Sequence, residues 1–485
     1  MCGLIGVTGT VESAYEVYLG LMNLQHRGQD GAGILTTETR RGKEFHLQKG
    51  TGLVENVFSE RSFKNLRGSA AIGHARYATI GRNDPNMLQP FLDYGLGLGL
   101  GHNGQIVNFY ALRERFIGPA DTAAVHLESD SELILWLLSS QLADKEINAE
   151  TLFLAIRTCM EDLVGSYAVI GLLREGGLFG FRDPNGIRPL VLGRKVNGGG
   201  APAHALASET AALAFLGYNS MEEIGAGEAV YITKEGEVVR RVLHQESYSP
   251  CMFEWVYFAR VESEFGGTSV YKARFKLGQI LADQLRKLGI EADVVIPVPE
   301  TSRVSATAIA ECLGLPCREL LIKNRYINRT FILEGQESRL EAIRRKLFPI
   351  AEEIEGKRCM IVDDSIVRGN TARQIVKLVR QAGAKEVTLV STCPPISSPC
   401  YYGIDFPSPT ELVAYNRTEA EIAEALGVDR VVFQTVEGLK DALGQMSLCT
   451  GCLTRQYPTD IESGLEFEAN RQKDRQGPMT EKTRQ

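Results

Sequence analysis

The sequence predicts a protein of more than one domain, whose second half is an α/β domain with a parallel sheet. A chain of 485 residues is too long for one ordinary domain, and two or three domains are expected. From residue 275 to residue 445, short apolar strand patterns alternate with helical patterns, which is typical of a parallel sheet. The predicted strands are Asp293–Val298, Cys359–Val362, Glu386–Thr392 and Val431–Gln434.

The composition is that of a globular protein without a membrane span. Apolar residues make up 44% of the chain and charged residues 23%, so each domain can bury a full core. We find no run of about 18 apolar residues, and the N-terminus has no basic region followed by a long apolar core. We therefore expect a cytoplasmic protein with no membrane partner. The net charge of −7 argues against nucleic acid as the main partner.

One strand-to-helix stretch in the second half is the most specific feature of the sequence. The apolar run Cys359–Val362 ends in Asp363-Asp364, and a helical pattern begins at Asn370-Thr371 after a turn-prone segment. α/β proteins bind ligands at the carboxyl ends of their strands, and the N–H groups of a helix N-terminus suit a phosphate. The paired carboxylates suit sugar hydroxyls, or a Mg²⁺ that the phosphates also hold.

This stretch resembles the phosphoribosyl pyrophosphate (PRPP) motif of type I phosphoribosyltransferases. The resemblance implies that Asp363 and Asp364 hold the ribose hydroxyls and Mg²⁺. It also implies a cradle for the 5-phosphate, made of Ser365, Arg368, Gly369, Asn370 and Thr371. A surface turn capped by Asp and Thr is the alternative, and it would be favoured for shorter fragments of the run.

A second strand-to-helix junction follows Asp293–Val298. In the same family the equivalent junction holds pyrophosphate, and here it comprises Glu300, Thr301, Ser302 and Arg303. An acid is unusual in a pure anion site, so Mg²⁺ is expected to mediate there, with Thr301 as a ligand.

The basic loop from Lys323 to Phe331 resembles the family's flexible lid, which closes over PRPP before chemistry. In this reading Lys323 and Arg329 bind the substrate. A nucleic-acid patch and a solvated loop are the alternatives.

The N-terminus supplies a candidate nucleophile. Removal of Met1 leaves Cys2 with a free α-amino group, whose reference pKa of about 7.7–8.0 lets it accept a proton near neutral pH. A thiol and its own base then belong to one residue. For this position alone, a buried Cys that starts a strand would be the better interpretation.

Three other segments favour the interpretation of Cys2 as a nucleophile. Arg76 suits a carboxylate, and Asp130 lies in an acidic cluster that reads as the N-terminal cap of an apolar helix, 133–142. Asn103-Gly104 offers an amide and a flexible N–H group to an oxyanion. Such a set is suited to cleaving the side-chain amide of a free amino acid.

In their order along the chain and in their residues, these segments resemble the class II glutamine amidotransferase domain. The resemblance implies an α+β fold of the N-terminal nucleophile type, with αββα layers. It implies that Cys2 is the nucleophile and that Arg76 binds the glutamine carboxylate. Asp130 then takes the α-amino group, while Asn103 and Gly104 form the oxyanion hole. The turn 181–190 is expected to shape the glutamine pocket or the domain contact.

The cysteine pattern suggests a metal or cluster site. Cys449 and Cys452 form a local dithiol that suits a metal, a cluster or a redox pair, although a thioredoxin-like context is absent. Cys251 and Cys400 fall where cluster-bearing members of the PRPP amidotransferase family have ligands. The resemblance therefore implies a structural, oxygen-sensitive [4Fe–4S] cluster. Zinc and four free thiols are the alternatives.

Over roughly residues 1–465 the chain resembles the glutamine PRPP amidotransferase family. The resemblance implies that ammonia from glutamine displaces pyrophosphate from PRPP, giving 5-phosphoribosylamine in the first committed step of purine synthesis. It also implies a homotetramer or homodimer, with purine nucleotides as inhibitors. We expect a glutaminase domain at 2–235, a transferase domain at 250–468 and a disordered tail at 469–485.

Three other functions compete with this one. An amidotransferase could feed a different acceptor, but the stretch 358–371 argues against it. A non-catalytic PRPP-sensing regulator would have no use for Cys2 with its supporting residues. A degenerate paralogue is the third, because Val261 and Glu262 stand where the family usually has Pro and Asp.

Overall fold

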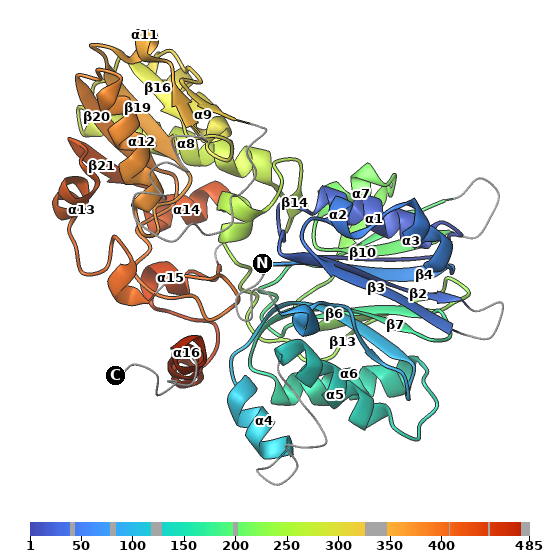
Figure 1. Cartoon of the computed structure of the whole chain (residues 1–485). Helices are drawn as coiled ribbons and strands as arrows, with labels where there is room; N and C mark the ends of the chain where they lie inside the picture. The colour runs from blue at the N-terminus through green and yellow to red at the C-terminus, as the bar shows by residue number, and fades with distance from the viewer. Residues whose placement is uncertain are drawn as a thin grey trace, which may run out of the picture.

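The fold of most of the chain is given by a computed structural model. It describes residues 1–38, 44–77, 84–117, 129–196, 202–324, 347–406, 408–444 and 447–476. Figure 1 shows two bodies, one built by the first half of the chain and one by the second, with the N-terminus between them.

Two stacked antiparallel sheets form the first body. Within the described residues, the first sheet has the order β11 (Ser220–Glu223), β9 (Val191–Lys195), β10 (Ala203–Ala207), β1 (Gly3–Thr8), β4 (Ala70–Arg76), β2 (Gly31–Glu38) and β3 (Glu44–Thr51). The second has the order β13 (Val238–Val242), β12 (Glu228–Ile232), β8 (Leu178–Arg182), β7 (Gly165–Leu173), β6 (Leu98–Ile106) and β5 (Phe91–Asp93).

Helices cover the outer face of each sheet (Figure 1). On the first sheet lie α1 (Ser13–Asn23), α2 (Val54–Val57), α3 (Glu60–Asn65) and α7 (Thr210–Phe215). On the second lie α4 (Phe109–Ile117), α5 (Asp130–Leu142) and α6 (Ala149–Asp162). Buried Leu4, Ile72, Ile170 and Leu206 belong to the apolar core between the sheets. This is the αββα layering that the resemblance implied.

Local sequence explains the close packing of these layers. At Gly73 of β4, a Cβ atom would lie 2.4 Å from Cγ1 of Val17, so glycine lets α1 approach the sheet. Helix α5 begins with a capping box, in which the N–H of Glu132 donates to Oγ of Ser129 (3.2 Å) and the N–H of Ser129 donates to Oε2 of Glu132 (3.1 Å). The predicted apolar helix and its acidic cap are thereby confirmed.

The second body contains the predicted parallel sheet. Its order is β16 (Val294–Pro297), β19 (Arg358–Asp363), β20 (Glu386–Ser391) and β21 (Arg430–Phe433), and all the neighbours run parallel. The apolar core on one face includes side chains of α8 (Val270–Lys287) and α9 (Arg303–Leu313). The core on the other face includes α12 (Asn370–Gln381) and α13 (Glu419–Leu426). The four strands predicted from the sequence are confirmed.

Shorter elements complete the second body. Two-stranded sheets are formed by β14 (Glu264–Phe265) with β15 (Thr268–Ser269), and by β17 (Leu321–Lys323) with β18 (Leu347–Pro349). The further helices are η2 (Glu254–Phe258), α11 (Ala351–Ile354), η3 (Pro409–Glu411), α14 (Val436–Leu443), α15 (Gly451–Thr454) and α16 (Ile461–Gln476). Helix α16 continues to Gln476, into the range expected to be a disordered tail.

An apolar core joins the two bodies. Met1, Val107 and Ile187 of the first half belong to one buried cluster with Met252 and Tyr402 of the second. This cluster holds the N-terminus at the junction, and Cys2 therefore lies beside both bodies.

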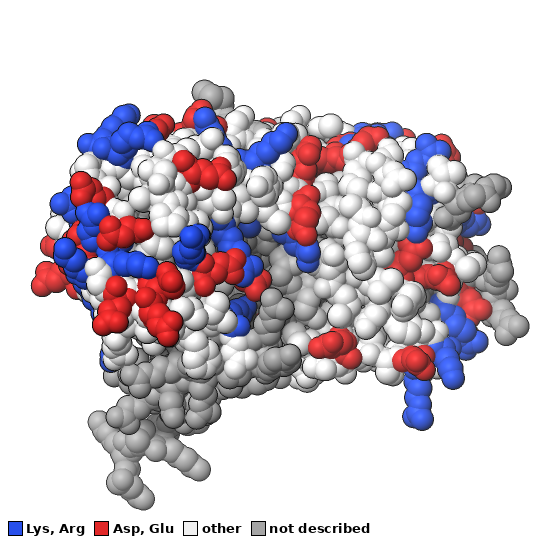
Figure 2. All heavy atoms as spheres, turned by 90° about the horizontal axis from the view of Figure 1, so that it is seen from above, with Lys and Arg blue, Asp and Glu red and all other residues white. Residues whose placement is uncertain are grey.

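The surface carries charges of both signs. Over the face in Figure 2, acidic and basic side chains are interspersed, and neither sign forms one continuous patch. Among the described residues, no helix is long and apolar enough to cross a membrane.

Candidate active sites

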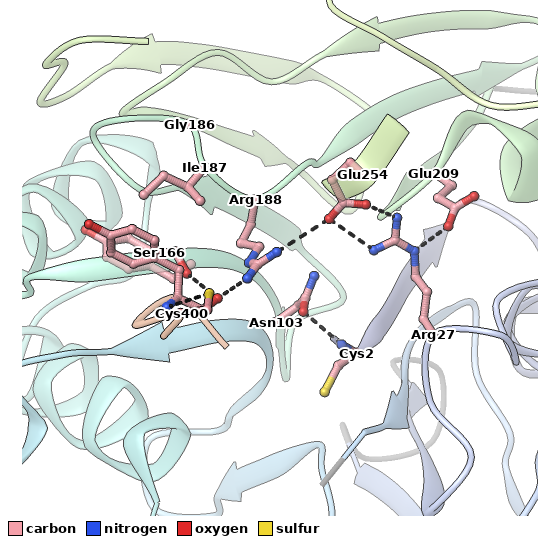
Figure 3. Close-up of polar contacts among 12 residues, drawn as sticks. Cys2, Arg27, Asn103, Ser166, Gly186, Ile187, Arg188, Glu209, Glu254 and Cys400 are labelled. Atoms are coloured by element: carbon pink, nitrogen blue, oxygen red, sulfur yellow. Dashed lines mark hydrogen bonds and ion pairs between the residues drawn. The ribbon is translucent and has the colours of Figure 1, made fainter. Parts of the chain in front are cut away.

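Cys2 lines a cavity of about 110 Å³ at the junction of the two bodies. The backbone N–H of Tyr77 donates to its thiol (N–Sγ 3.4 Å), and its own backbone N–H donates to Oδ1 of Asn103 (2.9 Å; Figure 3). Strand pairing brings these residues together, because β1 starts beside the end of β4, with Gly3 opposite Ala75. The sheet order thus places a thiol beside residues from distant parts of the chain.

Asn103 and Gly104 form a pair of candidate donors next to the thiol. Nδ2 of Asn103 is buried, and the described residues give it no hydrogen-bond partner. A buried donor without an acceptor costs about 1–3 kcal/mol, and a substrate oxygen would relieve that cost. Gly104 has a φ of 155°, and a Cβ there would lie 1.9 Å from the carbonyl oxygen of Ser166, so only glycine fits.

The two predicted glutamine-binding residues line the same cavity. Burial lowers the pKa of Arg76, while Cys2, Asp30 and Asp84 act in the opposite direction. Asp130 is the first residue of α5, and its Oδ2 accepts hydrogen bonds from Nε2 of Gln105 (2.9 Å) and the N–H of Ile106 (3.2 Å). A guanidinium group and a carboxyl group therefore both line the cavity, and together they suit a zwitterionic amino acid.

A larger cavity of about 700 Å³ lies at the carboxyl end of β19. Gly369, with a φ of 72°, turns the chain there and starts α12. Most residues predicted to bind PRPP line this cavity, namely Glu300, Thr301, Lys323, Asp363, Asp364, Ser365, Arg368, Gly369, Asn370 and Thr371.

Three predicted PRPP-binding residues are not placed in this lining. Ser302 is buried, and its hydroxyl donates to the carbonyl oxygen of Val298 (2.5 Å). Arg303 is turned to an exposed ion pair with Glu319 (Nε–Oε1 3.0 Å). Arg329 and the rest of the predicted lid from residue 325 lie outside the described residues.

The paired carboxylates lie beside each other at the end of β19. Burial raises the pKa of Asp363, and the neighbouring Asp364 raises it further. Burial also raises the pKa of Asp364, although Ser365, Arg274 and Thr301 act against this. Ionisation of both carboxyl groups is therefore unfavourable in the free protein. Sugar hydroxyls or Mg²⁺ would stabilise the ionised pair, and Mg²⁺ commonly takes one or two carboxylates together with substrate phosphates.

A buried ion network extends from the larger cavity across the domain junction (Figure 3). Arg27 lines the larger cavity and contacts Glu209 through Nε and Oε2 of Glu254 through Nη2 (2.6 Å). Nη1 of Arg188 lies 3.6 Å from Oε1 of Glu254. Burial alone would raise the pKa of Glu209, but Arg27 and His26 hold it well below its usual range. Glu254 thus joins the second domain to two arginines of the first.

We predict that Glu209→Gln strongly destabilises the protein. The change leaves Arg27 with less compensating charge in a buried place, which costs about 3–5 kcal/mol of unfolding free energy. Denaturant unfolding followed by fluorescence measures this. Glu150→Gln is the matched control, because Glu150 pairs with Arg241 (2.6 Å) on the exposed surface. Loss of this ion pair should leave the unfolding free energy unchanged. Equal effects of the two changes would contradict the prediction.

The four cysteines implied as ligands gather in one buried place. The apolar cluster at the junction contains Cys251, Cys400, Cys449 and Cys452. The backbones of Cys251 and Cys449 pair in an isolated parallel β-bridge. Burial raises the pKa of Cys251 to about 12. It also raises the pKa of Cys449 and Cys452, and neighbouring thiols, Cys400 among them, raise these further. Four buried thiols in one apolar cluster are the type of donor that a cluster with thiolate ligands takes.

In the described part of the chain, no three or more His, Cys, Asp or Glu side chains are arranged to hold a single metal ion. The four thiols share a buried place and an electrostatic environment.

Both cavities include residues to which the sequence gave no role. Gly403 and Phe467 of the second half line the smaller cavity beside Cys2. His26 and Arg27 of the first half line the larger one, together with Phe253 and Tyr257 of the second. Each cavity is thus built by both domains.

Comparisons with known proteins agree with this division of the chain. Residues 74–214 match the model of the glutamine amidotransferase domain, and residues 268–402 match that of the phosphoribosyl transferase domain. The chain is 42% identical to an amidophosphoribosyltransferase of Pseudomonas aeruginosa, over 92% of this chain and 89% of that protein. It is 40% identical to the amidophosphoribosyltransferase of Saccharomyces cerevisiae, over 97% and 96% of the two chains.

Solved structures give the same result over nearly the whole length. The chain is similar to a glutamine PRPP amidotransferase from B. subtilis in complex with ADP and GMP, with a TM-score of 0.84 and 36% identity. That match covers 95% of this chain and 98% of the other. A structure described as the allosteric regulatory enzyme of purine biosynthesis matches with a TM-score of 0.85 and 36% identity, over 95% and 97% of the two chains.

Proposed function

The chain belongs to the amidophosphoribosyltransferase family, and from this premise we propose how its two cavities divide the family's reaction. The protein transfers ammonia from glutamine to PRPP, giving 5-phosphoribosylamine, glutamate and pyrophosphate in purine biosynthesis. In our proposal, glutamine is hydrolysed in the smaller cavity and PRPP is bound in the larger one. A non-catalytic regulator is not favoured, because the similar proteins named above are amidophosphoribosyltransferases.

Hydrolysis of glutamine begins at Cys2. Once Met1 is removed, the α-amine of Cys2 takes the thiol proton, and sulfur attacks the side-chain amide carbon. Nδ2 of Asn103 and the N–H of Gly104 stabilise the oxyanion that forms. Collapse of this intermediate releases ammonia and leaves a thioester, which water hydrolyses to glutamate. Arg76 and Asp130 hold the carboxylate and the α-ammonium of the substrate.

Transfer to PRPP takes place against the loop 363–371. The N–H groups at the start of α12 bind the 5-phosphate, and Asp363 and Asp364 hold the ribose hydroxyls. Mg²⁺ fits the ionised aspartate pair, with Thr301 as a further oxygen ligand, and when bound it would neutralise charge on the departing pyrophosphate. Ammonia attacks C1 and pyrophosphate leaves, so the protein contributes mainly positioning and charge stabilisation.

One observation carries this division of labour. Oδ1 of Asn103 accepts a hydrogen bond from the N–H of Cys2, while its Nδ2 is buried and has no partner among the described residues. The test follows glutamate and pyrophosphate together in an anaerobic preparation, with and without PRPP and Mg²⁺. Near-equal release of both products, only with PRPP present, supports the proposal. Pyrophosphate release with ammonia but not with glutamine would disprove the role of Cys2.

We propose further that the four buried cysteines hold a [4Fe–4S] cluster with a structural role. When bound, the cluster would supply four bonds to thiolates and thereby join segments 251, 400 and 449–452. Support comes from the donor set, since four thiols from three separate segments belong to one buried cluster. Zinc is the competing occupant.

Replacing Cys449 with Ser is expected to remove the cluster. The variant, purified without oxygen, should lose its iron and sulfide content and the visible absorption of the cluster, because one of four ligands is gone. Cys159 is the matched control, since it is equally buried but lies on α6 of the first domain. Cys159→Ser should keep the iron. Zinc instead of iron in the unaltered protein would contradict the cluster.

We propose that purine nucleotides inhibit this enzyme. The similar B. subtilis structure holds ADP and GMP. A nucleoside monophosphate shares a 5-phosphate and ribose hydroxyls with PRPP, so the loop 363–371 would accept it in competition with the substrate. A homotetramer or homodimer remains a prediction.

A further inference from the structure

A loop of the second domain lies directly against the proposed oxyanion hole. Gly403 lines the cavity that contains Cys2. A Cβ atom at Gly403 would lie 2.9 Å from the carbonyl oxygen of Gly104 and 3.1 Å from its carbonyl carbon. The φ of Gly403 is 90°, a conformation that glycine adopts readily. The two glycine backbones are therefore in contact across the domain junction.

The residue before Gly403 is fixed by buried donors of the first domain. The hydroxyl of Ser166 donates to the carbonyl oxygen of Tyr402 (3.0 Å), and Nη2 of Arg188 donates to the same oxygen. Ser166 and Arg188 are fully buried. The N–H of Tyr402 donates to Sγ of Cys400 (3.3 Å), and Figure 3 shows Ser166, Arg188 and Cys400 close together. A buried carbonyl with two such donors has little freedom to move.

We propose that Tyr402 and Gly403 are positioning residues for the oxyanion hole. The inference rests on the proposed role of Asn103 and Gly104 in glutamine hydrolysis. Oxyanion stabilisation depends on donors that are fixed before the reaction, yet a glycine has more conformational freedom than any other residue. The loop at 402–403 packs against the Gly104 peptide and limits that freedom. The second domain thereby completes the glutaminase site as well as binding PRPP.

The test substitutes Gly403 with Ala and measures binding of glutamate γ-semialdehyde. The Cys2 thiol adds to this aldehyde, so that an S–C bond forms, the C=O π bond breaks and the oxygen receives the thiol proton. That oxygen lies where the oxyanion would be. Glutamate, which forms no such adduct, reports on the rest of the cavity. Calorimetry gives both affinities for the full-length protein.

We expect Gly403→Ala to lower the affinity for the aldehyde by about 10- to 100-fold, since loss of one oxyanion donor lowers kcat by about 10²–10³-fold. The affinity for glutamate should change by no more than about twofold. With glutamine as substrate, kcat should fall while KM stays constant. Ammonia-dependent synthesis of phosphoribosylamine, which bypasses the smaller cavity, should be unchanged.

Two further variants control for strain and for misfolding. Gly427→Ala also places alanine at a positive φ (75°), but nothing lies within 4 Å of its Cβ at the end of α13, so aldehyde binding should be unaffected. Ser166→Ala removes one hydrogen-bond donor to Tyr402 without adding an atom, and it should lower the affinity for the aldehyde severalfold. It tests the proposal even if Gly403→Ala does not fold.

The outcomes separate this inference from the proposed function. If the unaltered protein forms no adduct with the aldehyde, the assignment of Cys2 fails, and the inference fails with it. If the adduct forms but Gly403→Ala and Ser166→Ala bind the aldehyde normally, only the inference is overturned. Equal losses for glutamate and the aldehyde would show a general packing defect and would also overturn it.

Discussion

Replacing Cys2 with Ala is expected to abolish phosphoribosylamine synthesis from glutamine while synthesis from ammonia continues. Ala is small, so Met1 is still removed and the α-amine remains, but no sulfur is left to attack the amide. Loss of a nucleophile that acts together with its base typically lowers turnover by more than about 10⁴-fold. Pyrophosphate release, measured with each nitrogen source, reports both activities of the same sample.

A cysteine outside both cavities provides the matched control. Cys312 is partly buried on α9, and Cys312→Ala should retain both activities. Glutamine-dependent synthesis that survives in Cys2→Ala would show that another group cleaves the amide. Loss of both activities would show instead that Cys2 supports the junction between the domains.

Replacing Asp363 with Asn is expected to abolish PRPP binding and, at the same time, to stabilise the unliganded protein. Asp363 is buried beside Asp364, and both burial and its neighbour raise its pKa. Asn has similar volume and no charge, so we expect about 1–3 kcal/mol of added stability at neutral pH. When PRPP is present at 100 times its Kd, its binding adds about 2.7 kcal/mol to the unfolding free energy of the unaltered protein. PRPP should add nothing to the stability of the variant.

The pH dependence follows from the direction of the pKa shift. The carboxyl pKa of Asp363 is higher in the folded protein than the ordinary value of 3.8, so the folded state holds the proton more tightly than the unfolded chain. Stability is therefore full below the unfolded pKa and is lost as the pH rises through the folded pKa. The advantage of Asp363→Asn should appear above that range and disappear in acid.

Thermal unfolding as a function of pH, with and without Mg²⁺ and PRPP, measures both effects. Asp283→Asn removes the same charge from an exposed position on α8, where Asp283 pairs with Arg286 (2.7 Å), so it should change neither stability nor PRPP binding. A variant that is less stable than the unaltered protein at neutral pH would show that Asp363 is already compensated without ligand.

The sequence by itself determined those parts of the sites that are contiguous in the chain. The loop 363–371 is a strand end, a turn and a helix start in one run, so its ability to bind phosphate depends on local backbone geometry. The same holds for Asp130, which lies inside the local capping box of Ser129 and Glu132. Strand alternation in the second half predicted the parallel sheet because each strand is buried on both faces.

The tertiary structure alone decided which distant residues complete each cavity. The contact of Gly403 with Gly104 and the place of Arg27 beside Glu254 join segments that no local pattern connects. It also turned Ser302 and Arg303 away from the larger cavity, although they adjoin Thr301, which lines it. Local periodicity determines which residues form strands and helices, whereas burial and charge compensation arise only when the two domains pack together.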